Sequence, residues 1–95
     1  MMSMIESAVA ALTEKVGGGF DGSAKFEIEG EGAIMVDSDG VRAGDGDADV
    51  TLKADAETFQ GIMAGDVNPT TAFMSGKLSV DGDMGMAMKL AGVLA

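Results

Sequence analysis

The chain has 95 residues, 46% of them apolar, and its 16 acidic and 6 basic residues give a formal net charge of −10. A chain of this length buries only about 60–65% of its unfolded surface, so we expect a single domain over residues 1–95. The acidic surplus argues against nucleic acid and anionic headgroups as partners, and the absence of cysteine and histidine excludes thiolate and imidazole chemistry.

The sequence predicts no segment that inserts stably into a membrane. It contains no run of about 18 apolar residues, and its first residues include Glu6 where a secretory signal has basic residues. The final Val-Leu-Ala also differs from the peroxisomal Ser-Lys-Leu ending. We therefore expect a cytoplasmic protein.

The first predicted element is an amphipathic helix that begins after Ser3. Ser3 and Glu6 have the spacing of a capping box, in which each residue accepts a hydrogen bond from the backbone of the other. Consecutive glycines at 17–19 then end the helix, because they lose too much backbone entropy to continue it. One apolar stripe follows the helical spacing: Ile5, Val9, Leu12 and Val16.

Four strands are predicted next. Residues 24–30, AKFEIEG, alternate apolar with charged side chains, which indicates a strand with one buried face. Residues 33–37, AIMVD, form a continuous apolar run, which indicates a strand covered on both faces. Residues 41–43 can pair back as a short third strand, and residues 49–54, DVTLKA, alternate again as a fourth.

The period then changes to that of a helix. Asp55 is a suitable N-cap for a helix of about ten residues that ends at Gly65. Pro69 fits the first position of one or two further helical turns. The apolar residues of these two helices are Phe59, Ile62, Met63, Phe73 and Met74.

A fifth strand and a last helix complete the chain. Residues 77–83, KLSVDGD, place Leu78 and Val80 on one face of a strand. Asp83 then caps a terminal helix from about Met84 and complements its dipole. The order of helix, four strands, two helices, strand and helix predicts an α+β fold, in which helices cover one face of a mainly antiparallel sheet.

The acidic segment 37–49 raises the question of a calcium site. Asp45, Asp47 and Asp49 have the spacing of the first ligands of an EF-hand loop. The sixth position is Val50 instead of glycine and the twelfth is Ala56 instead of glutamate, so the loop does not fit. Solvated acids that protect the sheet edge are favoured, with a weak surface cation site as the alternative and no metal site predicted.

Catalytic and cofactor motifs are not apparent. The glycine-rich residues 17–22 follow a helix and precede a strand, which is the reverse of the dinucleotide-binding arrangement. Without histidine or cysteine a nucleophile would need Ser or Thr beside a base, and no such grouping has a recognisable spacing. We therefore predict a protein that is not an enzyme and has no cofactor.

The methionines are the unusual feature, since nine of the 95 residues are Met. In the terminal segment Met84, Met86 and Met88, with their aliphatic neighbours, cover nearly the whole helix circumference, so one face can pack on the sheet while another meets something else. Flexible thioethers suit a surface that adapts to varied ligands. An apolar ligand site, a partner or homodimer surface, and ordinary core packing all remain open at this point.

Three segments resemble the sterol carrier protein 2 (SCP2) lipid-transfer family in order and spacing. They are ADVTLKAD at 48–55, MAGDVNPTTAFMSGKL at 63–78 and VDGDMGMAMKL at 80–90. The resemblance is weaker over residues 1–48, where it follows only the order of helix and strands. Two departures are the missing peroxisomal ending and the lack of an aromatic residue in the second strand.

The resemblance implies a five-stranded sheet in the order 3-2-1-4-5 and a hydrophobic tunnel between the sheet and its helices. It also implies non-covalent binding, with possible transfer, of a lipid: a fatty acid, fatty acyl-CoA, phospholipid or sterol. A protein-interaction module that uses the same methionine-rich surface is the alternative. By position and helix phase, the implied lipid-binding residues are Phe59, Met63, Phe73, Met74, Met84, Met88, Ala91 and Leu94.

Overall fold

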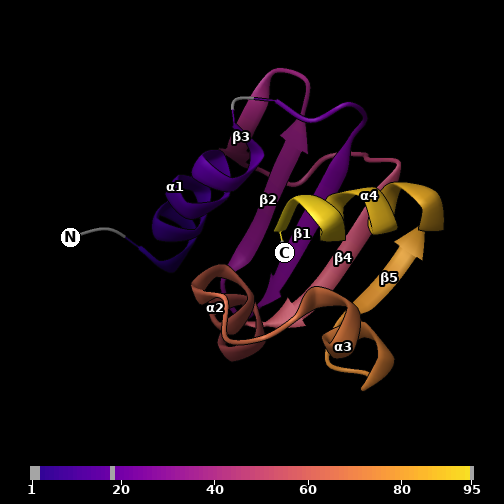
Figure 1. Cartoon of the computed structure of the whole chain (residues 1–95). Helices are drawn as coiled ribbons and strands as arrows, with labels where there is room; N and C mark the ends of the chain where they lie inside the picture. Colours follow the sequence, from indigo (N-terminus) through magenta and orange to yellow (C-terminus); the bar gives the residue numbers. More distant parts are fainter. Residues whose placement is uncertain (1–2, 18, 95) are drawn as a thin grey trace.

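Helices cover one face of a five-stranded sheet in the computed structural model, which describes residues 3–17 and 19–94 (Figure 1). The elements in chain order are α1 (Met4–Val16), β1 (Ala24–Glu29), β2 (Gly32–Asp37), β3 (Gly40–Ala43), β4 (Val50–Asp55), α2 (Ala56–Ala64), α3 (Pro69–Met74), β5 (Ser79–Gly82) and α4 (Met84–Leu94). The prediction of the α+β class is confirmed.

The strands lie in the order β3-β2-β1-β4-β5, as the resemblance implied. β1 pairs in parallel with β4, and the other three neighbouring pairs are antiparallel, so the sheet is mixed and mainly antiparallel. The parallel register sets Phe26 beside Leu52. β5 begins at Ser79, two residues later than the sequence predicts, and buried Leu78 precedes it.

The two ends of α1 have the local features that the sequence predicts. The backbone N–H of Glu6 donates to Ser3 Oγ at 3.1 Å, and the Ser3 N–H donates to Glu6 Oε1 at 3.5 Å, which confirms the capping box. Gly17 then adopts φ +74°, a left-handed conformation that other residues adopt at a cost. Gly18, part of the predicted glycine stop, lies outside the described residues.

Aspartate and asparagine cap the later helices. Asp55 accepts from the Thr58 N–H at 2.7 Å at the start of α2, and Asp83 Oδ1 accepts from the Met86 N–H at 3.0 Å at the start of α4. Asn68 does the same for α3, accepting from the Thr70 N–H at 2.9 Å. The first two caps confirm the predictions, and the Asn68 cap is additional.

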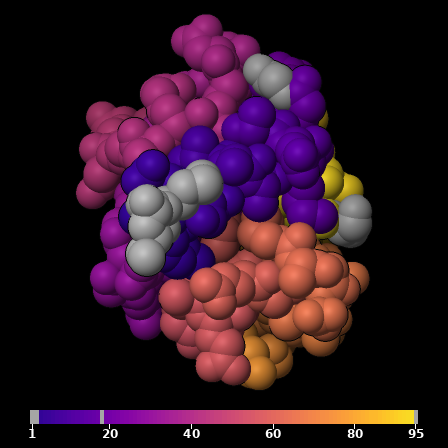
Figure 2. Space-filling view, turned by 90° about the vertical axis from the view of Figure 1, so that its left-hand side faces the viewer, coloured from indigo at the N-terminus to yellow at the C-terminus, as the bar shows by residue number. Residues whose placement is uncertain are grey.

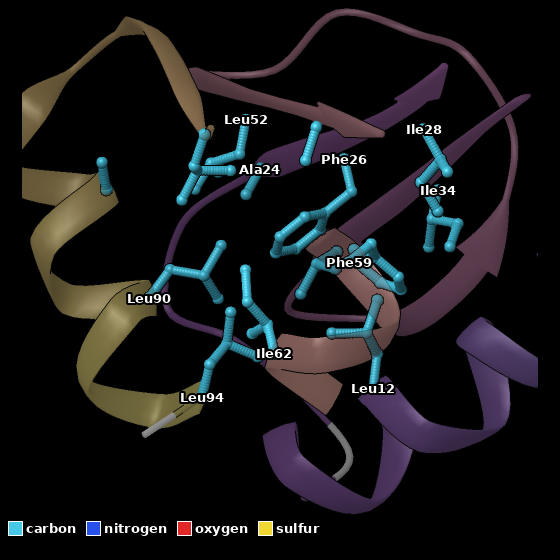
Figure 3. Close-up of a cluster of buried hydrophobic side chains, with 14 of the residues drawn as sticks. Leu12, Ala24, Phe26, Ile28, Ile34, Leu52, Phe59, Ile62, Leu90 and Leu94 are labelled. Carbon is cyan, nitrogen blue, oxygen red and sulfur yellow. The ribbon is translucent and has the colours of Figure 1, made fainter. Parts of the chain in front are cut away.

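The core lies between the helices and the inner face of the sheet (Figure 3). The Phe26 ring of β1 meets the Phe59 ring of α2 edge to face, with centroids 5.5 Å apart. Leu12 of α1 and Leu90 of α4 are fully buried in the same cluster. Each helix therefore contributes its apolar stripe to one core, which is where most of its stabilisation arises.

The outer face of β2 is covered by the loop that joins β3 to β4. Met35 points away from the helices and is only 6% exposed, because Gly44 and Gly46 of this loop lie against its side chain. Asp45 of the loop pairs with Lys25 Nζ at 2.8 Å, and the hydrogen bond from this pairing raises the pKa of Lys25. The prediction that this strand is covered on both faces is confirmed.

The Asp55 cap predicts a specific pH dependence of stability. The Thr58 N–H lowers the pKa of the Asp55 carboxyl below the ordinary 3.8. A folded-state pKa below the unfolded one adds stability that is fully present well above the unfolded pKa, and that is lost as pH falls through the folded pKa. In Asp55→Asn the side-chain amide oxygen can still cap the helix, but the amide group has no proton to gain or lose over this pH range.

We therefore expect wild type to exceed Asp55→Asn in melting temperature at pH 7, and the difference to shrink toward zero as the pH falls through the lowered pKa of Asp55. Circular dichroism melts across this range give the comparison, and Asp81→Asn on exposed β5 is the control for loss of one surface charge. A difference between wild type and Asp55→Asn that stays constant with pH would contradict the assignment.

Candidate functional site

Among residues 3–17 and 19–94, four large apolar side chains are exposed, and they come from two adjacent helices. Phe73 and Met74 of α3 are 38% and 80% exposed, and Met84 and Met88 of α4 are 46% and 61% exposed. We call these four residues the α3–α4 patch. A cluster of large apolar groups in water lowers solubility, so such a patch is typical of a binding surface.

A narrow apolar hollow lies beneath this patch. Its volume is about 30 Å³, room for about two water molecules, whereas ligand pockets usually have about 300–1,000 Å³. Of the ten described residues that line it, only Thr70 has a polar side chain. The lining consists of Leu52, Pro69, Thr70, Phe73, Leu78, Val80, Met84, Ala87, Met88 and Ala91.

The terminal helix, α4, is anchored from its inner side. Leu90 and Leu94 are 0% and 2% exposed in the core. Lys89 Nζ pairs with Asp21 at 3.0 Å and lies 5.7 Å from the centre of the Phe20 ring. The outer side of α4 carries Met84 and Met88, which line the hollow without being enclosed. The helix thus holds its position while two flexible side chains stay free to move.

A second hollow lies between α1 and α2, on the face that Figure 2 presents, where indigo α1 meets salmon α2. Its volume is about 440 Å³, which falls within the range of ligand pockets. Ser7 and Gln60 add polar groups to an otherwise apolar lining. The remaining lining residues are Met4, Ala8, Ala11, Phe59, Met63 and Ala64.

The buried core separates the two hollows. Leu52 lines the hollow under α3 and α4, and Phe59 lines the hollow between α1 and α2. Phe26 is the strand neighbour of Leu52, and its ring meets the ring of Phe59 (Figure 3). Phe26 is only 2% exposed. These two hollows share no lining residue, and a continuous tunnel between them stays a prediction.

The eight residues predicted to bind lipid fall into three groups. Four of them line the hollow under the α3–α4 patch: Phe73, Met84, Met88 and Ala91. Phe59 and Met63 line the hollow between α1 and α2. Leu94 is buried in the core, and Met74 is the most exposed member of the α3–α4 patch; neither lines one of these two hollows.

Sequence reasoning did not identify the sheet side of the hollow under α3 and α4 or the α1 side of the hollow between α1 and α2. Leu52, Leu78 and Val80 were assigned to strand faces, and their meeting point under α3 depends on how the strands pair. The placement of Leu78 and Val80 on one strand face was the only feature of the sequence that pointed to this lining. The α1 residues of the larger hollow, Met4, Ser7, Ala8 and Ala11, carried no signal beyond helix periodicity.

The chemistry available at these hollows is that of apolar contact. The groups with shifted pKa values are a helix cap, Asp55, and members of surface ion pairs, Lys25, Asp37 and Arg42, and none of them lines the hollow under α3 and α4. In residues 3–17 and 19–94 no group of three or more acidic side chains could hold a metal ion. Over the same residues no helix is long and apolar enough to cross a bilayer.

Comparison with known families matches the SCP-2 sterol transfer family over residues 6–95. Hydroxysteroid dehydrogenase-like protein 2 of Danio rerio is 42% identical over 82 residues, which cover 78% of this chain and 20% of that protein. Sterol carrier protein 2 of Gallus gallus is 43% identical over 61 residues, 64% of this chain and 10% of that protein. The chain thus corresponds to about a fifth or less of these relatives.

Solved structures show the same fold. The crystal structure of sterol carrier protein 2 like 2 of Aedes aegypti superposes with a TM-score of 0.78 at 25% identity, over 95% of each chain. The solution structure of sterol carrier protein 2 of Aedes aegypti in complex with palmitate, a C16 fatty acid, gives a TM-score of 0.78 at 18% identity, over 100% of this chain and 97% of that one.

The anchoring of α4 predicts unequal effects of two substitutions on one helix. Leu90→Ala removes a fully buried side chain and should lower the free energy of unfolding by about 2–5 kcal/mol. Met88→Ala, two residues away and 61% exposed, should change it by less than about 1 kcal/mol. Urea denaturation measures both, and similar losses would mean that Met88 also anchors the helix.

Proposed function

Since this chain belongs to the SCP-2 sterol transfer family, we propose that it binds the hydrocarbon part of a lipid without covalent chemistry and serves as a lipid carrier. The observation that supports this most directly is the apolar hollow beneath the α3–α4 patch. The candidate ligands are fatty acids, fatty acyl-CoAs, phospholipids and sterols. We further propose one lipid-binding domain over residues 1–95, acting in the cytoplasm.

Binding requires the narrow hollow to widen. Met84 and Met88 occupy its outer wall and have three rotatable side-chain bonds each, so they can swing toward solvent without moving the anchored inner side of α4. Each buried methylene contributes about 0.8 kcal/mol, and association costs at least about 4 kcal/mol. A long acyl chain can offset this cost and a chain of a few carbons cannot.

The hollow between α1 and α2 supports a second part of the same proposal. Its volume of about 440 Å³ is already that of a ligand pocket, and Ser7 and Gln60 could meet a polar group. A ligand that displaced the Phe26 ring would join the two hollows into the tunnel that the resemblance implies. We therefore assign Phe59 and Met63 to one end of this proposed tunnel, and Met84 and Met88 to the other.

A non-catalytic role is supported by the polarity of the hollow under α3 and α4. A general acid or base must reach a reacting atom, and the described lining there offers a single hydroxyl, that of Thr70. The enzyme-like names of some relatives belong to much longer proteins, of which this chain matches about a fifth or less. We propose that the chain binds and releases its ligand unchanged.

Paired substitutions test which surface binds lipid. Met88→Asp places a charge in the apolar lining and should weaken binding of a fluorescent long-chain fatty acid at least about tenfold. Met74→Asp adds the same charge on the neighbouring helix but outside both described hollows, and should change affinity less than about twofold. Fluorescence titration of the delipidated protein gives both values.

Ala64→Asp tests the hollow between α1 and α2, because it adds a charge to the lining of that hollow at the exposed edge of α2. Weakening by Met88→Asp alone assigns the acyl chain to the hollow under α3 and α4. Weakening by both Met88→Asp and Ala64→Asp supports one ligand that spans the two hollows. Absence of saturable binding by wild type to fatty acid, acyl-CoA and sterol would refute the carrier function.

A partner or homodimer surface is the second candidate, because four large apolar side chains form the α3–α4 patch. The patch would then be covered by a second copy or another protein instead of leading to a ligand. Sedimentation velocity at increasing concentration measures self-association directly. A dimer is favoured if the mass of wild type doubles with increasing concentration while Met74→Asp keeps the mass of a monomer, since Met74 is the most exposed member of the patch.

A further inference from the structure

Sulfur atoms lie at the mouth of the proposed ligand site. Met84 and Met88 are one turn apart on α4, are 46% and 61% exposed, and line the hollow under α3. Met74 is 80% exposed outside the described hollows, while Met35 is 6% exposed beneath the β3–β4 loop. The same molecule therefore contains methionines that are accessible and in the site, accessible and outside it, and buried.

Accessible methionines react with peroxides. The thioether sulfur attacks the terminal peroxide oxygen, the O–O bond breaks, a sulfur–oxygen bond forms, and water leaves when the oxidant is hydrogen peroxide. Sulfur is oxidised to the sulfoxide and the peroxide is reduced. The product side chain keeps its length but becomes polar, and methionine sulfoxide reductases can reverse the change.

We propose that Met84 and Met88 are oxidation sites through which a peroxide lowers the affinity of the chain for apolar ligands. This inference rests on the proposed lipid binding at the same hollow. A sulfoxide oxygen that entered the hollow would lose its water contacts, and among the described lining residues only Thr70 has a side-chain donor. The oxidised side chains therefore either turn toward solvent or bury the sulfoxide oxygen at a cost in free energy. In both cases the hollow loses its apolar outer wall.

The fold should persist through this reaction. Ala87, Leu90 and Leu94 hold α4 on the core, and none of them is oxidised. The pairing of Lys89 with Asp21 at 3.0 Å also stays available. Oxidation of Met84 and Met88 thus alters the outer side of α4 and leaves its buried leucines unchanged, so that affinity can change while the secondary structure does not.

The test compares fatty-acid affinity before and after hydrogen peroxide treatment of the 95-residue chain. Peptide mass spectrometry should find sulfoxide at Met74, Met84 and Met88 well before Met35. Affinity for a fluorescent long-chain fatty acid should fall about tenfold in wild type, with an unchanged far-ultraviolet circular dichroism spectrum. Treatment with methionine sulfoxide reductases should restore it.

Leucine variants identify the residues responsible, because leucine matches methionine in volume and is not oxidised. The double variant Met84→Leu/Met88→Leu should have the same affinity before and after peroxide, whatever its starting value. The control Met74→Leu removes an accessible sulfur outside the described hollows and should lose affinity upon oxidation as wild type does.

Three results would overturn the inference. The first is sulfoxide at Met84 and Met88 with wild-type affinity unchanged, and the second is an equal loss of affinity in the double leucine variant. Either leaves lipid binding by untreated protein intact and refutes only the oxidation sites. The third is untreated wild type that binds no fatty acid, acyl-CoA or sterol, which refutes the proposed function and the inference together.

Discussion

The parallel pairing of β1 with β4 constrains the rest of the structure. Parallel strands cannot be joined by a tight turn, so the chain must cross the sheet after β3 before it can enter β4. The β3–β4 loop makes this crossing over the outer face, where it covers Met35 and where Asp45 meets Lys25. The inner face stays free for the helices, and the whole apolar core forms on that side.

The two sides of α4 have different physical roles. Its leucines are buried and fix the helix on the core, whereas Met84 and Met88 remain at the surface above an apolar hollow. Rigid placement and side-chain freedom are thereby combined in eleven residues. This combination suits ligands of differing shape, because the unbranched thioether side chain can adjust while the backbone that carries it does not.

Phe26 is the core residue that links the linings of the two hollows. Its ring contacts Phe59, which lines one hollow, and its strand neighbour is Leu52, which lines the other. A well-packed aromatic pair stabilises the core, while a continuous apolar cavity would lose those contacts. A ligand that displaced the Phe26 ring would therefore remove a contact that stabilises the core without ligand.

The sequence by itself determined the elements and their order, because caps, glycine stops and apolar periodicity act over a few residues. Ser3 with Glu6, Asp55 and Asp83 specified three helix starts, and the resemblance of residues 48–90 to a known family supplied the strand order. Only the tertiary structure decided that Phe73, Met84, Met88 and Ala91 share a hollow with Leu52, while Phe59 and Met63 lie at another and Met74 at neither. A hollow is the volume left between side chains from distant segments, and helix phase gives the direction of a side chain but not what fills the space before it.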